Sequence, residues 1–401
     1  MNTILKNEIM EVLCDFQKGY TERNLHNLDN YTKRLFTNDA DVRVIGTSPG
    51  EICLGFEKIK QLIEADWKYW GDVSCDLNNP IIVNLDENIA FIALKGSVKL
   101  TFKYDEKKIN SLKEVINKNI YEELDFDTTT YKELKQKVFL LNWTIAQWCI
   151  GYPEKKDHHI PLIITGVLKK QTDKWKFKQM SFSVSSLNVP DYLFFRNSND
   201  SEAKKQLKNF KQNCYGETEE IQILLNSLQN YWNENEFIGT NLFNKIFDNE
   251  NPLIISPEGN LITHKDKFID ELNCMKDIWN EFNLDIESSA INTENNTGWA
   301  LTLGTVKTKI SSKILLQSLL NKSKTILDNK CNIKQQYITI LRHISSVFMI
   351  ENQGEDFEIP IRVETVFSKK NSWKIKYIQI SYGYELIYEH RTKKLNLWGK
   401  E

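Results

Sequence analysis

The chain has 401 residues, more than one compact core normally holds, so two domains of ordinary size are expected. Hydrophobic residues make up 41% and charged residues 26%, with a net charge of −2. Both signs are mixed along the chain, which excludes the clustered basic surface expected of a nucleic-acid-binding protein. No window approaches the roughly eighteen apolar residues of a membrane span, and the charged N-terminal segment does not resemble a signal peptide.

The seven cysteines are scattered along the chain, and none belongs to a CxxC pair. This pattern favours reduced thiols in a cytoplasmic protein. The sequence shows neither zinc-ligand spacing nor a phosphate-binding loop, so we expect no metal and no cofactor. Heavy use of Asn, Ile and Lys is typical of AT-rich coding genomes and indicates a bacterial source.

The first part of the chain predicts helices, then a strand–turn–helix unit, then a sheet. The unit is Asp41–Asp76, and its helix from about Gly55 has one apolar face that includes Trp67 and Trp70. A register shift in the strand pattern predicts a β-bulge at Gly96. The predicted elements are helices over 4–37, strands over 80–83 and 89–102, a helical insertion over 105–137, and a meander of strands over 138–150, 160–170 and 175–184.

The same order of elements returns in the second part of the chain. A diverged copy of the Asp41–Asp76 unit occupies Asn251–Ile286, with Trp279 at the position of Trp70. An internal duplication is therefore predicted, with domains at 1–190 and 217–401 and a linker at 191–216. The predicted elements of the second part are a helix over 218–237, strands over 297–310, 337–351, 358–368 and 373–384, and a helical insertion over 311–335.

Helices first, one helix between strands and then a curved antiparallel sheet form an α+β pattern. We expect two tandem cone-shaped domains, each with its sheet wrapped around the N-terminal helices and each with a helical insertion. The open mouth of such a cone commonly holds a ligand.

These residues resemble the SnoaL-like domains of the nuclear transport factor 2-like superfamily. The motifs that carry the resemblance are DVRVIGTSPGE from Asp41, GFEKIKQLIEADWKYWGDV from Gly55 and WKFKQMSFS from Trp175. The resemblance covers about 40–185, and 251–382 more weakly. It implies the fold, whereas the superfamily includes both enzymes and non-catalytic binding or assembly domains.

Such domains often place histidines at inward positions of the last strand. Here those positions hold Gln179 and Ser181, and the second copy holds Tyr377 and Gln379. None of these is a general base at neutral pH, so no catalytic residue is assigned. Buried polar groups of this kind either pair with one another or meet a ligand. The candidate ligand-pocket residues are Trp67, Trp70, Trp143, Gln147, Gln179, Ser181, Tyr377 and Gln379.

The leading hypothesis is a non-enzymatic protein that binds a small apolar or aromatic ligand or serves as an assembly module. The alternative is an isomerase, dehydratase or hydrolase, which requires a buried acid or base such as Asp66 or His158 facing a cavity. Domains of this type often dimerise through the outer sheet face, so we expect an intramolecular pseudo-dimer or a homodimer, and neither a nucleic-acid nor a membrane partner.

Overall fold

The computed structural model describes most of both predicted domains. The described residues are 3–47, 51–102, 128–130, 141–142, 156–185, 200–234, 237–250, 252–309, 312–328, 336–337, 339–341, 343–345, 347 and 356–382. Among them, no helix is long and apolar enough to cross a membrane.

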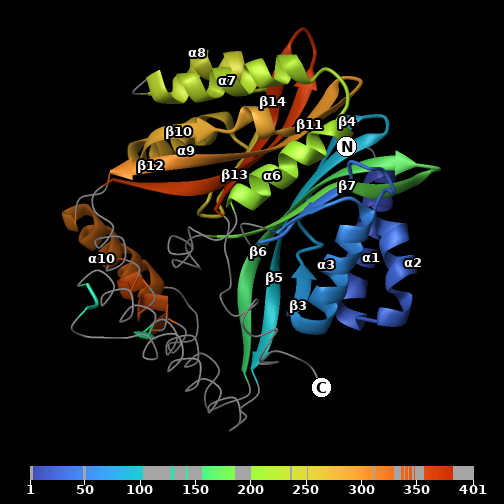
Figure 1. The fold of residues 1–401 in the computed structure, drawn as a ribbon, viewed down its shortest axis with the longest axis horizontal. Coiled ribbons are helices and arrows are strands. Elements are labelled where there is room, and N and C mark those ends of the chain that lie inside the picture. Colours follow the sequence, from blue (N-terminus) through green and yellow to red (C-terminus); the bar gives the residue numbers. More distant parts are fainter. Residues whose placement is uncertain are drawn as a thin grey trace.

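In the described residues of the first half, the helices α1, α2 and α3 combine with a seven-stranded sheet (Figure 1). Its elements are α1 (Thr3–Glu22), the 3-10 turn η1 (Leu25–Asn27), α2 (Leu28–Leu35), β1 (Arg43–Ile45), β2 (Ile52–Leu54), α3 (Phe56–Tyr69), β3 (Asp72–Cys75), β4 (Ile81–Asp86), β5 (Ile89–Phe102), β6 (Lys156–Gln171) and β7 (Lys174–Val184).

The second half repeats this plan with a second seven-stranded sheet. Its elements are α7 (Thr218–Glu234), α8 (Thr240–Ile246), β8 (Leu253–Ile255), β9 (Leu261–Ile262), α9 (Lys265–Ile278), β10 (Trp279–Leu284), η5 (Ile286–Ser288), β11 (Ala290–Glu294), β12 (Thr297–Lys309), α10 (Ser312–Asp328), β13 (Asp356–Lys369) and β14 (Trp373–Ser381).

The two sheets have the same topology, which confirms the predicted pair of tandem α+β domains. The strand order is β2-β1-β7-β6-β5-β3 in the first sheet and β9-β8-β14-β13-β12-β10 in the second. In each sheet the short first strand pairs in parallel with the last strand, Val44 opposite Met180 and Ile254 opposite Ile378. An additional strand pairs with the long strand in each sheet, β4 with β5 and β11 with β12.

Individual contacts are duplicated as well as elements. The side-chain carbonyl of Gln17 accepts a hydrogen bond from the backbone N–H of Cys75 at 2.8 Å, and Gln229 accepts one from Leu284 at 2.6 Å. Both contacts tie the first long helix of a half to the strand that follows its third helix. The predicted match of Trp70 with Trp279 also holds, because these residues end α3 and α9.

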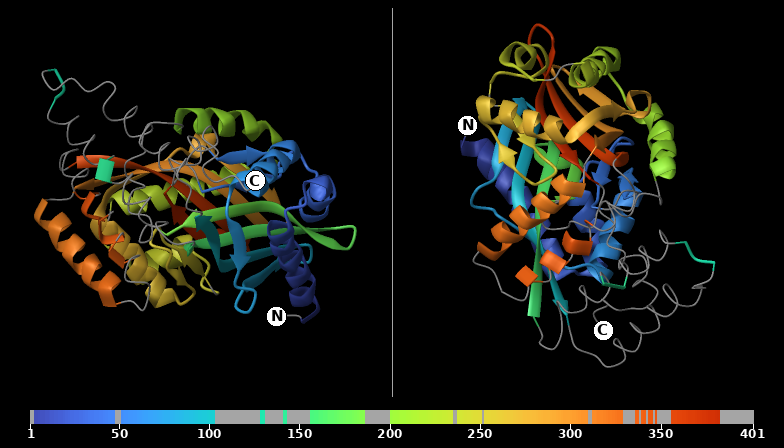
Figure 2. Two further views of the ribbon diagram at one scale, coloured as in Figure 1. Left: turned by 90° about the horizontal axis from the view of Figure 1, so that it is seen from below. Right: turned by 90° about the vertical axis from the view of Figure 1, so that its left-hand side faces the viewer.

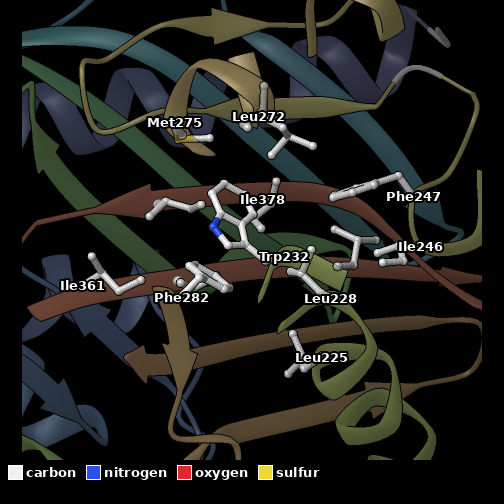
Figure 3. Packing of buried hydrophobic residues seen from close by; sticks show 14 of the residues in the cluster. Leu225, Leu228, Trp232, Ile246, Phe247, Leu272, Met275, Phe282, Ile361 and Ile378 are labelled. Atoms are coloured by element: carbon white, nitrogen blue, oxygen red, sulfur yellow. The ribbon is translucent and has the colours of Figure 1, made fainter. Parts of the chain in front are cut away.

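Each half has its own core between the helices and the inner face of its sheet. Residues on α7 recur at the spacing that places them on one helix face, and they are buried: Ile221, Leu225, Leu228 and Trp232. Figure 3 shows the Trp232 indole surrounded by side chains of α9, β10 and β14. The matching face of α1, with Ile9, Leu13, Phe16 and Tyr20, fills the first core.

Helices α1, α2 and α3 of the first half and α7, α8 and α9 of the second lie on the side of their own sheet away from the other half, so the two outer sheet faces meet (Figures 1 and 2). A buried apolar cluster joins these faces. It contains Ile89, Phe91, Ala93, Ile163 and Val167 from the first sheet and Leu253, Ile255, Trp299, Val366 and Tyr377 from the second.

The segment predicted as a linker, 191–216, contains the helix α6 (Asp200–Phe210) followed by the 3-10 turn η4 (Lys211–Asn213). Three apolar residues of α6, Ala203, Leu207 and Phe210, are buried. They share one cluster with Ile45 and Ile52 of the first half and with Ala290, Leu301 and Leu303 of the second half. The connection therefore stabilises the contact between the halves by apolar burial.

The prediction of strands over 138–150 and 337–351 is wrong at every residue of these segments that the structure describes. Leu141 and Asn142 are helical, and so are the described residues between 337 and 347. The reason is that β6 already has two partners, since β5 pairs with it from Ile89 opposite Lys169 to Phe102 opposite Lys156, and β7 pairs with its other edge. The meander of the first sheet is therefore β5-β6-β7. The insertion predicted over 105–137 lies almost entirely outside the described residues.

The predicted bulge at Gly96 is also wrong, because β5 pairs with β6 on both sides of Gly96, and with β3 as far as Gly96, without a register shift. A Cβ atom at Gly96 would lie 2.7 Å from the backbone oxygen of Ser74, so glycine allows β3 to approach β5 closely. The equivalent Gly304 faces the backbone oxygen of Asn283 at 2.4 Å.

We expect Gly96→Ala to lower the free energy of unfolding by about 1–3 kcal/mol, because the methyl group meets backbone rather than a movable side chain. Urea unfolding followed by circular dichroism measures this loss. Ser97→Ala on the same strand is the control and should change stability by less than about 0.5 kcal/mol. Equal stability of the Gly96 variant and the wild type would contradict the close-approach explanation.

Candidate functional site

The structure divides the predicted pocket residues between two places. Trp67 and Trp70 lie in the first core, at the end of α3. Gln179 and Ser181 on β7, and Tyr377 and Gln379 on β14, are buried between the two halves of the chain. Trp143 and Gln147 lie outside the described residues.

The alternation of side chains along the last strands explains this division. Met180 and Phe182 belong to the first core, so Gln179 and Ser181 between them point to the opposite, outer face of the sheet. Ile378 and Ile380 belong to the second core in the same way. The positions expected to point into a cone therefore face the other half of the chain.

A continuous network of hydrogen bonds crosses between the halves around Gln179. Its side-chain carbonyl accepts from Nε of Arg43 at 2.7 Å, and its amide donates to Oε2 of Glu364 at 3.1 Å. Ser181 donates to the other oxygen of Glu364 at 2.5 Å. Arg43 also donates to Oδ1 of Asn292 at 3.2 Å. One amide thus links a cation of the first half to a carboxylate of the second.

A related group of contacts surrounds Gln379. Its carbonyl accepts from the hydroxyl of Thr165 at 3.1 Å and from the hydroxyl of Tyr377, while its amide donates to Ser183 at 2.7 Å. Arg362 donates to the backbone oxygen of Gly46 at 2.7 Å. Buried polar groups need partners, and most of these find them in one another, although Nη2 of Arg43 and Nδ2 of Asn292 make no hydrogen bond among the described residues. We call these residues the interface network: Arg43, Thr165, Gln179, Ser181, Ser183, Asn292, Arg362, Glu364, Tyr377 and Gln379.

The acid of the interface network is Glu364, which is 1% exposed. Burial raises the pKa of its carboxyl group above 4.5, while the hydrogen bonds from Ser181 and Gln179 and the charges of Arg362 and Arg43 oppose that rise.

A second polar group lies inside the first core. The hydroxyl of Tyr20 on α1 donates to Oδ2 of Asp66 on α3 at 2.7 Å. Tyr20 is 1% exposed, and Asp66 is half-buried. Burial, together with the charge of Asp66, raises the pKa of Tyr20 well above its usual value. The phenol therefore stays protonated and acts as a donor.

Aromatic rings surround this pair. Trp67 packs against Tyr31 with ring centroids 4.9 Å apart and meets Tyr20 edge-on at 6.4 Å. Trp70 meets Phe182 edge-on at 6.4 Å. The indole N–H groups of Trp67 and Trp70 are buried, and no atom of the described residues accepts a hydrogen bond from either. We call Tyr20, Asp66, Trp67 and Trp70 the first-core polar site.

Arg23 fixes one end of this site. It lies just after α1 with a φ of 50° and donates to the backbone oxygen of Trp70 at 2.6 Å and to that of Gly71. It also pairs with Asp72 at 3.0 Å. A cation that binds the carbonyls just beyond the C-terminal end of α3 stabilises that helix end and positions Trp70.

The second core lacks the polar pair. The duplicated spacing places Trp232 at the position of Tyr20 and Met275 at the position of Asp66, and both are buried in an apolar cluster. The position of Trp67 holds Lys276, which donates to the backbone oxygen of Trp232. The two cores therefore differ in chemistry at equivalent positions.

The histidines considered as catalytic or metal-binding residues do not form a site in the described part of the chain. His159 is exposed on β6, and the side chain of its neighbour His158 lies outside the described set. In the part of the chain that the structure describes, no three His, Cys, Asp or Glu residues are placed to hold a metal ion.

Sequence reasoning missed Arg43, Arg362, Glu364 and Tyr20. The signal for three of them was a charged residue inside an otherwise apolar strand, as in DVRVI and IPIRVETVF. The signal for Tyr20 was weaker, because a tyrosine on an apolar helix face fits a core equally well. Neither pattern identifies the partner, which lies more than a hundred residues away for Arg43 and Gln179.

Comparisons with known proteins find no matching family model and no matching curated protein. Solved structures do match. A nuclear transport factor 2-like superfamily protein from Salmonella enterica serovar Typhimurium LT2 is 12% identical, with 45% of this chain and 92% of that chain covered and a TM-score of 0.28. A ketosteroid isomerase-like protein from Erwinia carotovora is 10% identical, with 46% and 98% covered and a TM-score of 0.26.

A third matched structure, an NTF-2-like protein of unknown function from Shewanella oneidensis, is 9% identical. It covers 44% of this chain and 97% of its own, with a TM-score of 0.25. Each match is thus about as long as one half of the chain.

The raised pKa of Glu364 predicts how stability depends on pH. Between the unfolded-state value near 4.5 and the raised folded-state value, the folded chain binds more protons than the unfolded chain, so this group's contribution to the free energy of unfolding falls as pH rises. We expect the wild type to lose stability relative to Glu364→Gln over that window, measured by urea unfolding at successive pH values. Glu358→Gln, at an exposed position of β13, is the control. A pH-independent difference for the Glu364 variant would contradict the assignment.

Proposed function

We propose that the protein is a non-enzymatic binding protein whose first core holds a small, largely apolar or aromatic ligand. The observation that supports this most is the first-core polar site, where a hydrogen-bonded Tyr–Asp pair lies beside two buried indole N–H donors that lack acceptors among the described residues. The second core also has buried indole N–H groups without an acceptor among the described residues, at Trp232 and Trp373, so the Tyr–Asp pair is what distinguishes the first core. A buried donor without a partner is destabilising, and a ligand oxygen would relieve that penalty. The ligand would therefore carry a carbonyl or hydroxyl group on an apolar body.

The second half would have a structural role. Its core is apolar where the first core is polar, and its outer sheet face covers that of the first half. We propose that the chain works as an intramolecular pseudo-dimer, in which the second half holds the sheet of the first half rigid. Rigid support is what a preorganised binding site requires.

The alternative function, acid–base catalysis, rests on the same Tyr20–Asp66 pair. Oδ2 of Asp66 already accepts a hydrogen bond from Tyr20, so this oxygen is not free to take a proton from a bound molecule. Binding is therefore the function that this geometry supports best, and a catalytic role would require Asp66 to abstract a proton from the bound molecule.

We expect 2-acetylnaphthalene, an apolar ring system with one carbonyl group, to raise the melting temperature by several degrees at saturating concentration. Trp70→Phe keeps an aromatic ring but removes the N–H donor, so it should weaken binding by about fivefold, the worth of one hydrogen bond. Isothermal titration calorimetry measures the change in Kd.

The matched control is Trp279→Phe, which makes the same change at the equivalent position of the second half. It should lower stability without changing Kd. Loss of binding in this variant, or unchanged binding in Trp70→Phe, would contradict the assignment to the first core. Exchange of the acetyl protons of the bound probe with deuterium, seen by NMR and abolished by Asp66→Asn, would favour the catalytic alternative.

A further inference from the structure

The strand registers of the two sheets define which interface residues are equivalent. Thr165 pairs with Ser181 in the first sheet, and Glu364 pairs with Gln379 in the second, so Thr165 and Glu364 are equivalent. By the same registers, Arg362 is equivalent to Ile163, and Arg43 on β1 to Leu253 on β8. Each buried charge of the interface network therefore has an uncharged counterpart in the other half.

The hydrogen bonds between the halves are also related by an approximate two-fold symmetry. Ser181 donates to Glu364, and the equivalent of this contact joins Gln379 to Thr165. In a two-fold interface, if residue i contacts residue j, then j contacts i. The geometry is thus that of a symmetric dimer, whereas the charges are not symmetric.

We propose that Arg43, Arg362 and Glu364 make the outer sheet face of the first half complementary to that of the second half. Neither face is then complementary to a second copy of itself. The partner of each face is the other half of this chain, and pairing between two identical halves is excluded. This proposal is independent of the ligand proposed for the first core.

Pairing of two first halves shows why. Arg43 would keep its hydrogen bond to Gln179 but would find the neutral Thr165 in place of Glu364. Arg43 is fully buried, and of the two carboxylates whose charges stabilise it, Asp41 of its own half and Glu364, only Asp41 would remain, which is already paired with Lys178. Removing one partner of a buried ion pair is strongly destabilising because the remaining charge stays desolvated.

Pairing of two second halves fails for the opposite reason. Glu364 would meet Gln379 and Tyr377 in place of Ser181 and Gln179, and Leu253 would stand where Arg43 stands. The carboxylate would keep the charge of Arg362 on its own strand, but it would lose the hydrogen bonds from Ser181 and Gln179 and the charge of Arg43. Only the mixed pair brings Arg43 and Glu364 together.

A double-mutant cycle in the full-length chain tests the charge complementarity. Each substitution introduces the residue that the other half has at the equivalent position, Arg43→Leu or Glu364→Thr. We expect either single variant to lower the melting temperature by about 5 °C or more. The double variant should lose clearly less than the sum of the two losses, because no buried charge of this pair is left alone.

The control cycle uses two exposed residues, Lys95→Leu on β5 and Glu358→Thr on β13, and should be additive. Additive losses in the Arg43 and Glu364 cycle would overturn the proposal, since the two charges would then not compensate each other.

A second experiment tests the choice of partner. A protease recognition sequence inserted between residues 191 and 199 allows the folded chain to be cut between its halves. After dilution and re-equilibration, native mass spectrometry should find only pairs of one first and one second half. Homotypic pairs or separated halves from the wild-type chain would overturn the proposal.

The same cut in the variant with Arg43→Leu, Arg362→Ile and Glu364→Thr should yield homotypic pairs beside mixed ones. This variant carries identical residues at all three equivalent positions of both halves. If it still forms mixed pairs alone, the shapes of the faces rather than their charges select the partner, and the proposal fails.

Discussion

The amide of Gln179 lies between a buried arginine of one sheet and a buried glutamate of the other. Neither charge has bulk water beside it, so each depends on polar partners from its own sheet and from the opposing one. The apolar cluster around the interface network removes water and strengthens those bonds. The relative position of the two halves therefore follows from a few polar contacts that must all be made together.

The interface does not determine which residues fill the core of each half, and the two cores differ in composition. The residues that form each core do not take part in the interface, because alternate residues of β7 and β14 point to opposite faces of the sheet. The first core keeps a tyrosine, an aspartate and two tryptophans with buried N–H groups. The second core has filled the equivalent space with Trp232, Met275 and other apolar side chains (Figure 3).

The predictions from sequence were wrong where one local sequence pattern is compatible with two different tertiary structures. The segments 138–150 and 337–351 alternate like strands, yet β6 and β13 already have both edges paired, which no local pattern reveals. Gly96 disturbs the alternation of β5 as a bulge would, but its actual reason is the approach of Ser74 from β3. Both errors concern contacts between residues that are distant in the sequence.

The sequence by itself determined the α+β class, the duplication and most elements, because periodicity and turn chemistry are local properties. It also marked Gln179, Ser181, Tyr377 and Gln379 as unusual, since polar side chains on apolar strands need partners. Only the tertiary structure decided that those partners lie in the other half, and that Tyr20 meets Asp66. Such pairings depend on which sheet faces meet and how helices cross, and these are set by the packing of the whole chain.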